Sequence, residues 1–293
     1  MKVIVFFAIL EKREGENNDF FISEASMNNR KCLVKGLRGM VCMAVLVVIL
    51  AACGCGGNRN LTLEKIAYDK SKDNPMVYLK ENNEYVPYLV LTSDYDGNVL
   101  LLRKNVLSEL KQYKQHGPLW SHYEYGSYYE ESSIDEFLNT EFLEVFSPEV
   151  KAAIADTTIE VTDIESYDKW NYATHTLERK IFLLSSVELG VKGLDGYTTT
   201  VEGKPLKYFR NKEYSVKVAY TEEGKACSYW TRTPELWESC TVVMLGIKGI
   251  DNCTADVYSG VRPAFCLGKD TIIQESDSII AGESVYVIGL DYE

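Results

Sequence analysis

The sequence predicts an α+β domain built mainly from an antiparallel, twisted sheet, with two helices preceding most of the strands. Two helix-start signals lie close together between residues 132 and 153. Short runs rich in Val, Ile, Tyr and Phe follow them, each bounded by residues typical of turns. Strands do not alternate with helices along the chain, as they would in a parallel sheet, so the pattern favours antiparallel pairing.

The first strand pair is predicted within residues 87–104. The runs YLVLTS and VLLLRKN lie on either side of Asp96-Gly97-Asn98. An Asp-Gly pair between two β-rich runs is typical of a tight hairpin turn, so we expect two antiparallel strands here.

Two helices are predicted from their N-terminal residues. Ser133 with Glu136 three positions later fits a capping box, which opens an apolar face. Ser147-Pro148-Glu149 supplies an N-cap, a proline at the first helical position and an acid in the first turn. Further strands are expected at residues 157–162, 180–187, 214–220, 228–232, 241–247, 255–258, 261–267 and 284–290.

The chain is acidic, with 31 Lys and Arg against 43 Asp and Glu and a formal net charge of −12. Such a surface repels nucleic-acid phosphates, so we expect no nucleic-acid partner. It also disfavours adsorption onto anionic lipid, so attachment to a membrane needs another cause.

The N-terminal region carries an export signal. The uncharged run from Met40 to Ala52 follows Arg30, Lys31, Lys35 and Arg38. This layout is typical of a secretory signal, and the run is shorter than the about 20 residues of a membrane-spanning helix. Its end, Leu50-Ala51-Ala52-Cys53, resembles the bacterial lipobox. The resemblance implies cleavage before Cys53 and lipid on its sulfur, and the alternative is an uncleaved signal anchor.

These features divide the chain into four segments. Acids within residues 1–26 belong in no signal, and Met27 starts a signal of ordinary proportions, so 1–26 is predicted to lie outside the translated protein. Residues 27–52 are then the signal peptide, 53–75 a polar flexible tether and 76–293 a single globular domain. We therefore expect an extracytoplasmic protein that is anchored to the membrane by lipid.

Four motifs in the globular part give a resemblance to a known family. They are SSIDEFLN at 132–139, FLLS at 182–185, YWTRTP at 229–234 and GVRPAF at 260–265. Their order resembles that of the bacterial domain of unknown function 6273 over residues 85 to 268. The sequence departs from that pattern at Asp135-Glu136-Phe137, where Arg and Trp are usual, and at Thr231, where Leu is usual.

The closing Gly-Val-Arg-Pro, with Trp and Arg upstream, is also similar to C-type-lectin-like folds. That likeness implies a compact twisted-sheet domain with a loop-rich face. In the resembled domain Trp230, Arg232 and Arg262 stand in or beside central strands, where a guanidinium binds buried carbonyls or a carboxylate. We interpret these three residues as structural pins, with ligand contact as the alternative.

A tyrosine-rich segment is the candidate ligand-binding surface, because rigid amphipathic rings among Ser and Gly suit contacts with glycans and proteins. The alternative is a loop that packs these rings against the sheet. The candidate residues are Trp120, Tyr123, Tyr125, Tyr128 and Tyr129.

The four cysteines of the globular part follow one another at equal intervals, at Cys227, Cys240, Cys253 and Cys266. An even number in an exported domain indicates disulfides in one of three pairings, and free buried thiols are the alternative. The spacing is not that of a zinc site.

No catalytic triad, phosphate-binding glycine loop or dinucleotide fingerprint occurs. We therefore expect a non-catalytic lipoprotein without cofactor or metal that binds an envelope or extracellular glycan or protein. An envelope hydrolase and a purely structural envelope component are the alternatives.

Overall fold

The chain divides into two compact units, Met1–Arg59 and Asn60–Glu293. The computed structural model describes residues of the second unit only, and the account below concerns that unit. The described residues are 61–71, 75–115, 127–163, 173–191, 201–235, 240–280 and 282–289.

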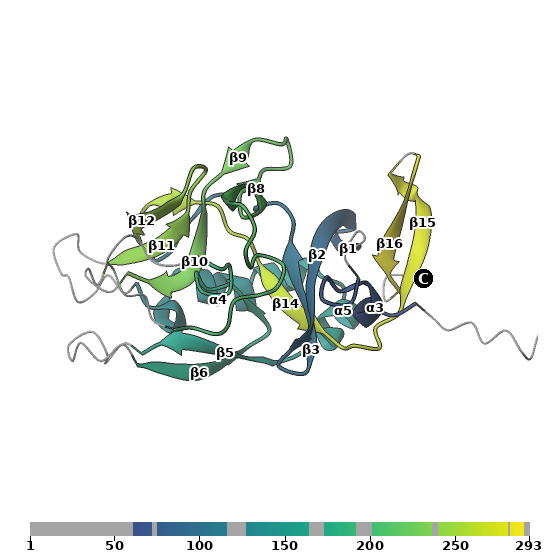
Figure 1. Ribbon diagram of the computed structural model, residues 1–293, viewed down its shortest axis with the longest axis horizontal. Helices are drawn as coiled ribbons and strands as arrows, with labels where there is room; N and C mark the ends of the chain where they lie inside the picture. The colour runs from purple at the N-terminus through teal and green to yellow at the C-terminus, as the bar shows by residue number, and fades with distance from the viewer. Residues whose placement is uncertain are drawn as a thin grey trace, which may run out of the picture. The chain divides into compact units, whose positions relative to one another are not determined.

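A seven-stranded sheet forms the centre of the folded unit, in the order β15-β16-β1-β2-β3-β14-β7 (Figure 1). Neighbouring strands are antiparallel except β1 and β16, which run parallel with Tyr78 opposite Val287. The prediction of a mainly antiparallel sheet is therefore confirmed. The strands are β1 (Met76–Glu81), β2 (Glu84–Tyr95), β3 (Asn98–Arg103), β7 (Ile181–Phe182), β14 (Ala264–Leu267), β15 (Ile273–Ile280) and β16 (Glu283–Ile288).

Smaller antiparallel groups of strands complete the β-structure. One three-stranded sheet has the order β10-β11-β12, and three strand pairs join β5 to β6, β13 to β4 and β8 to β9. These strands are β4 (Lys111–Gln112), β5 (Thr157–Thr162), β6 (Thr174–Arg179), β8 (Ala219–Tyr220), β9 (Ala226–Cys227), β10 (Tyr229–Pro234), β11 (Thr241–Leu245), β12 (Ile250–Thr254) and β13 (Tyr258–Ser259).

The predicted hairpin is the β2–β3 pair. Its turn contains Asp96 at φ 48° and Gly97 at φ 80°, and Tyr95 pairs with Asn98 across it. Two successive positive φ values are the geometry of the turn that an Asp-Gly pair favours. The hairpin prediction is confirmed.

Helical segments are few and short in the part of the chain that the structure describes. They are α3 (Leu63–Ile66), η1 (Tyr129–Glu131), α4 (Ser133–Asn139), η2 (Phe142–Val145), α5 (Pro148–Ala153) and η3 (Tyr214–Val216). Helix α5 begins as predicted, with Pro148 first and the Ser147 hydroxyl accepting from Val150 N. In α4 the cap is Ser132, one residue before the predicted Ser133, and its hydroxyl accepts from Asp135 N.

The folded unit begins earlier than the sequence suggested. Leu63 and Ala67 are fully buried, and Leu63 N donates to Thr271 O at 2.8 Å. The tether predicted for residues 53–75 therefore does not include residues 61–71. Leu61 O also accepts from Ile273 N at 2.9 Å, so this segment is fastened beside strand β15.

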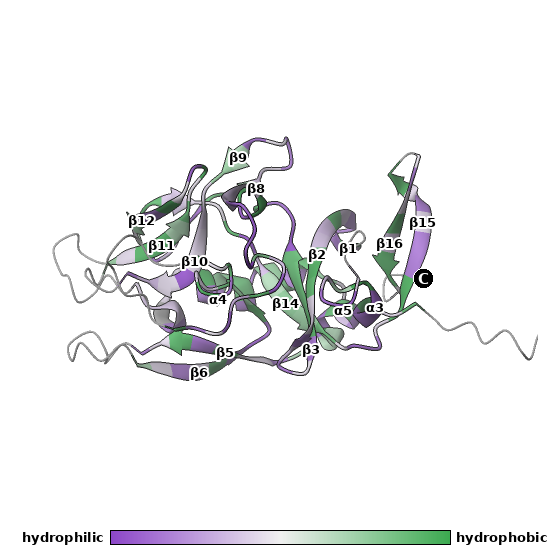
Figure 2. Cartoon of the chain, in the orientation of Figure 1, coloured by the Kyte–Doolittle hydropathy of each residue, from purple (hydrophilic) through white to green (hydrophobic). Residues whose placement is uncertain are grey.

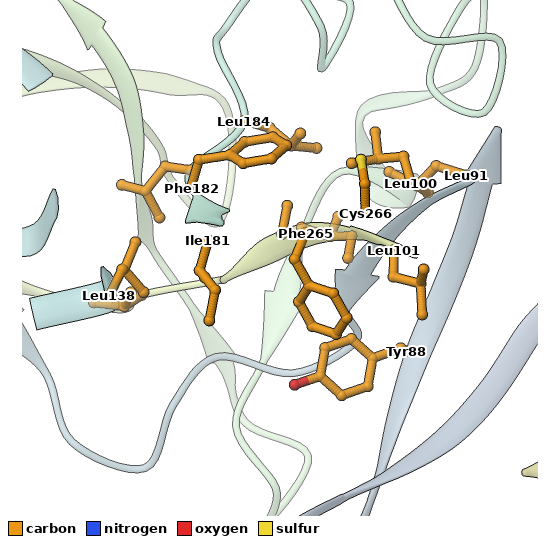
Figure 3. Packing of buried hydrophobic residues seen from close by; sticks show 14 of the residues in the cluster. Tyr88, Leu91, Leu100, Leu101, Leu138, Ile181, Phe182, Leu184, Phe265 and Cys266 are labelled. Atoms are coloured by element: carbon orange, nitrogen blue, oxygen red, sulfur yellow. The ribbon is translucent and has the colours of Figure 1, made fainter. Parts of the chain in front are cut away.

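Strand β14 lies at the middle of the hydrophobic core. Its adjacent residues Phe265 and Cys266 point to opposite sides of the sheet, and both side chains are fully buried (Figure 3). Phe265 packs edge-on against Tyr88 with ring centroids 5.2 Å apart. On the other side Cys266 lies near Leu100 and Leu91 (Figure 3). Because both faces of β14 are buried, its sequence reads as a continuous apolar run.

Some strands were missed because their sequences are polar. Strand β15 is mostly hydrophilic whereas its partner β16 is mostly hydrophobic (Figure 2). Strand β6 alternates between exposed and half-buried side chains. Conversely, the apolar run 180–187 forms only the short strand β7 before it turns. Among the described residues, none of the helices has the length and apolar character needed to cross a bilayer.

Candidate ligand-binding pocket

A pocket of about 650 Å³ opens where α4, η2 and β6 meet. Ten of its eleven lining residues are polar, and Leu143 is the apolar one. A wall of this kind offers many hydrogen-bond donors and acceptors to a ligand. The lining residues are Glu130, Ser132, Asp135, Glu136, Asn139, Thr140, Leu143, Asp156, Glu178, Arg179 and Lys180.

Asp135 and Arg179 form an ion pair in the wall of the pocket. Arg179 Nε donates to both Asp135 carboxylate oxygens at 2.9 Å, and its Nη2 donates to Oδ2 at 2.7 Å. The side chain of Asp135 is 4% exposed and that of Arg179 is 25% exposed. Burial raises the pKa of Asp135, and the contacts with Arg179 oppose that shift.

Asn139 fixes helix α4 in this position. It lies one helical turn after Asp135, so both side chains share a helix face. Its amide accepts from Ile181 N at 3.1 Å and donates to Ile181 O at 2.9 Å. The same amide donates to Asp135 Oδ1 at 3.1 Å, which links the helix, strand β7 and the ion pair.

The rim of the pocket is negatively charged. Lys180 pairs with Asp156 at 3.5 Å, and Glu130 lies 2.9 Å from the ring of His175. Glu136 and Glu178 are exposed and form no ion pair within the part of the chain that the structure describes. Within the same part, no three His, Cys, Asp or Glu side chains gather as a metal site.

A second polar network lies fully inside the protein, around Arg232. Its Nη1 and Nη2 donate to the Glu188 carboxylate at 2.7 and 2.9 Å. Nε donates to Glu160 O at 2.9 Å and Nη1 to Leu183 O at 2.8 Å. Tyr95 donates its hydroxyl to Glu188 at 2.6 Å. Arg232 thereby joins strand β10 to the segments that contain β5 and follow β7.

Glu202 is the second carboxylate of this network and is fully buried. It accepts from Thr162 N at 2.8 Å and from the hydroxyls of Thr162 and Thr233 at 2.6 Å each. Burial raises the pKa of Glu202, and the nearby charge of Arg232 opposes the shift.

The other two predicted pins are also buried. Trp230 donates its indole N–H to Lys111 O at 2.9 Å. Arg262 donates from Nε to Arg103 O at 2.8 Å and lies against the ring of Tyr229 at 5.5 Å from its centroid.

The predicted tyrosine surface is only partly described. Trp120, Tyr123 and Tyr125 lie outside the described residues. Tyr128 and Tyr129 are 6% and 1% exposed, so their rings contribute to the core and not to an open binding loop. This burial corrects the interpretation of those two residues as a binding surface. The hydroxyl oxygen of Tyr129 accepts from Leu183 N at 3.3 Å beneath the surface.

The four cysteines of the folded unit are free thiols in the structure. Cys266 is fully buried, and burial raises the pKa of its thiol to about 12. Cys227, Cys240 and Cys253 are half-buried.

Sequence reasoning missed the carboxylates that matter most in both networks. One signal was available for Glu188, since Ser185-x-x-Glu188 has the capping-box spacing. The structure shows that reciprocal pair, with Ser185 N donating to Glu188 at 2.9 Å and Glu188 N to Ser185 Oγ at 3.1 Å. The ion pair of Asp135 with Arg179 had no local signal.

Comparison with protein families decides the membership of the chain. The family described as "Domain of unknown function (DUF6273)" matches residues 96–269, more than half of the sequence. The chain belongs to this family. The DUF6273 segment contains every residue of the pocket and, apart from Tyr95, of the Arg232 network, whereas α3, β1, β2, β15 and β16 lie outside it. No curated protein and no solved structure matched the chain.

Proposed function

We propose that this chain is an exported lipoprotein whose DUF6273 domain binds a glycan of the cell envelope or its surroundings without acting on it chemically. The observation that carries the proposal is the pocket, whose wall is polar at ten of eleven positions. A ligand rich in hydroxyl groups satisfies such a wall better than an apolar one, because each buried polar group needs a hydrogen-bond partner. The volume of about 650 Å³ suits a short oligosaccharide.

Binding is favoured over hydrolysis by the state of Asp135. Both of its oxygens accept N–H groups of Arg179, so the carboxyl group is held in place by an ion pair. A general acid needs a transferable proton within reach of the substrate. The rival function, an envelope hydrolase, draws on the five carboxylates of the lining. Release of reducing ends from a bound glycan would favour it.

The test is a glycan array probed with the full chain in detergent. We expect binding to one glycan class, and a loss of at least tenfold in affinity for Glu136→Gln and Glu178→Gln. Both residues are exposed on the pocket rim, so folding is spared. Glu275→Gln on strand β15 is the matched control, because it removes the same charge from an exposed site outside the pocket. Equal binding by all three variants would contradict the proposal.

The lipid anchor is tested separately. We expect mass spectrometry of the purified protein to show an acylated N-terminal Cys53 and no peptide from residues 1–26. Cys53→Ser should leave unlipidated protein, because the acceptor sulfur is gone. A mature N-terminus upstream of Cys53 would contradict this part of the proposal.

The finer description of the fold as C-type-lectin-like is also a proposal. It is supported by the Gly260-Val261-Arg262-Pro263 sequence next to β14 and by Trp230 and Arg232 on β10. Superposition of an experimental structure on that fold class would test it.

A further inference from the structure

Three arginines of the described residues are almost fully buried, and one differs from the others. Arg103 pairs with Glu81 at 2.9 Å, and Arg232 pairs with Glu188 at 2.7 Å. Arg262 is 4% exposed and forms no ion pair with any described residue. Its Nη1 is buried and has no hydrogen-bond partner among them. A buried charge without a counter-charge is costly, so this position favours the binding of an anionic group.

The guanidinium of Arg262 is nevertheless held firmly. Its Nε donates to Arg103 O at 2.8 Å, and its plane lies against Tyr229. These contacts fix the direction of the remaining N–H groups. An arginine held in this way binds an oxyanion with little further loss of side-chain entropy.

A buried lysine lies close to the same tyrosine. The hydroxyl of Tyr229 donates to the backbone oxygen of Lys217 at 2.8 Å. Lys217 is 5% exposed, and its ammonium donates to Phe209 O at 3.3 Å. Burial lowers the pKa of Lys217, and no carboxylate opposes that shift. Lys217 also forms no ion pair within the described part of the chain.

The surrounding segment is basic in an otherwise acidic protein. Residues 204–217 contain five Lys or Arg and one Glu. Tyr208 of this segment is half-buried and packs edge-on against Phe209, whose backbone oxygen accepts from the Lys217 ammonium. Burial raises the pKa of Tyr208, and the charge of Arg262 opposes that rise. Lys212 lies over the ring of Tyr208 at 4.2 Å and over that of Tyr68 at 4.1 Å. Positive charge is thus concentrated in this segment.

We propose that Arg262, Lys217 and Tyr208 form an oxyanion-binding site that takes a phosphate or carboxylate group of a ligand entering beside Tyr208. The oxyanion accepts from Nη1 of Arg262 and from the Tyr208 hydroxyl, and it neutralises Lys217. This site shares no residue with the polar pocket, so it does not rest on the proposed glycan binding.

The experiment is calorimetric titration of the full chain in detergent with inorganic phosphate and, separately, with acetate at matched ionic strength. We expect saturable binding of at least one of them. Binding of phosphate alone assigns the natural group to a phosphate ester, and binding of acetate alone assigns it to a carboxylate. Tyr208→Phe keeps the ring contacts and should weaken binding at least tenfold, as should Lys217→Gln.

Arg210→Gln is the matched control, because it removes one positive charge from an exposed position of the same segment. It should bind within twofold of the unaltered chain. The proposal is overturned if neither anion binds, or if Arg210→Gln weakens binding as much as Tyr208→Phe. Should Lys217→Gln fail to fold, the comparison of Tyr208→Phe with Arg210→Gln decides the question.

Discussion

Glu188 and Arg232 form a two-pronged ion pair from which solvent is excluded, with N–O distances of 2.7 and 2.9 Å and side chains 1% and 0% exposed. The two residues lie 44 positions apart in the sequence. Arg232 Nε and Nη1 also donate to the backbone oxygens of Glu160 and Leu183. The pair therefore links β10 to two other chain segments. Its geometry indicates a role in stability.

Removing the arginine of this pair should destabilise the fold strongly. Arg232→Met leaves Glu188 buried without its counter-charge, so the free energy of unfolding should fall by about 3–5 kcal/mol. Urea unfolding followed by circular dichroism measures the change. Arg210→Met is the control, since Arg210 is exposed and its replacement should cost under about 0.5 kcal/mol. A loss for Arg232→Met as small as that of the control would show that the pair does not stabilise the fold.

The buried carboxyl of Glu202 should make stability depend on pH. The pKa of Glu202 in the folded protein is raised above the ordinary value of 4.5. Its contribution to the free energy of unfolding is therefore fully present below pH 4.5 and is lost as the pH rises through the folded pKa. The unfolding free energy of the unaltered chain, minus that of Glu202→Gln, should therefore decrease between about pH 4 and pH 7. Urea unfolding of both proteins at these two pH values measures this difference. A difference that increases with pH would mean that the pKa of Glu202 is lowered.

The cysteine thiols should differ in their reactivity toward alkylating reagents. At about pH 8 very little of Cys266 is thiolate, because burial raises its pKa to about 12. We expect iodoacetamide to modify the half-buried Cys240 in the folded protein and Cys266 only after unfolding. Peptide mass spectrometry identifies the sites. Repeating the labelling with reductant tests the disulfide prediction, because a cross-linked pair would react only after reduction.

Helix α4 should depend on the cap that the structure shows. Ser132→Ala removes the hydroxyl that accepts from Asp135 N and should cost about 1 kcal/mol of unfolding free energy. Ser133→Ala leaves that cap in place and removes a bond from Gln115 N at an exposed position, so it should cost less. Thermal unfolding of both variants compares them. A larger loss for Ser133→Ala would indicate that Ser133 is the N-cap, as the sequence suggested.

Local sequence signals predicted the features that depend on neighbouring residues. The Asp96-Gly97 turn and the start of α5 at Pro148 follow from the backbone preferences of a few adjacent residues. The family motifs also lie at the positions expected, within the matched segment 96–269. Strand β15 escaped prediction because its exposed side chains are polar, and only its pairing with β16 makes it a strand.

The sequence by itself determined the mainly antiparallel class, the hairpin, the start of α5 and the presence of a strand at β14. Only the tertiary structure decided that Asp135 meets Arg179, that Glu188 meets Arg232 and that Leu63 belongs to the core. The physical reason is distance along the chain. Periodicity reports which side of an element is buried, whereas the partner of a buried charge is set by segments that folding brings together from far apart.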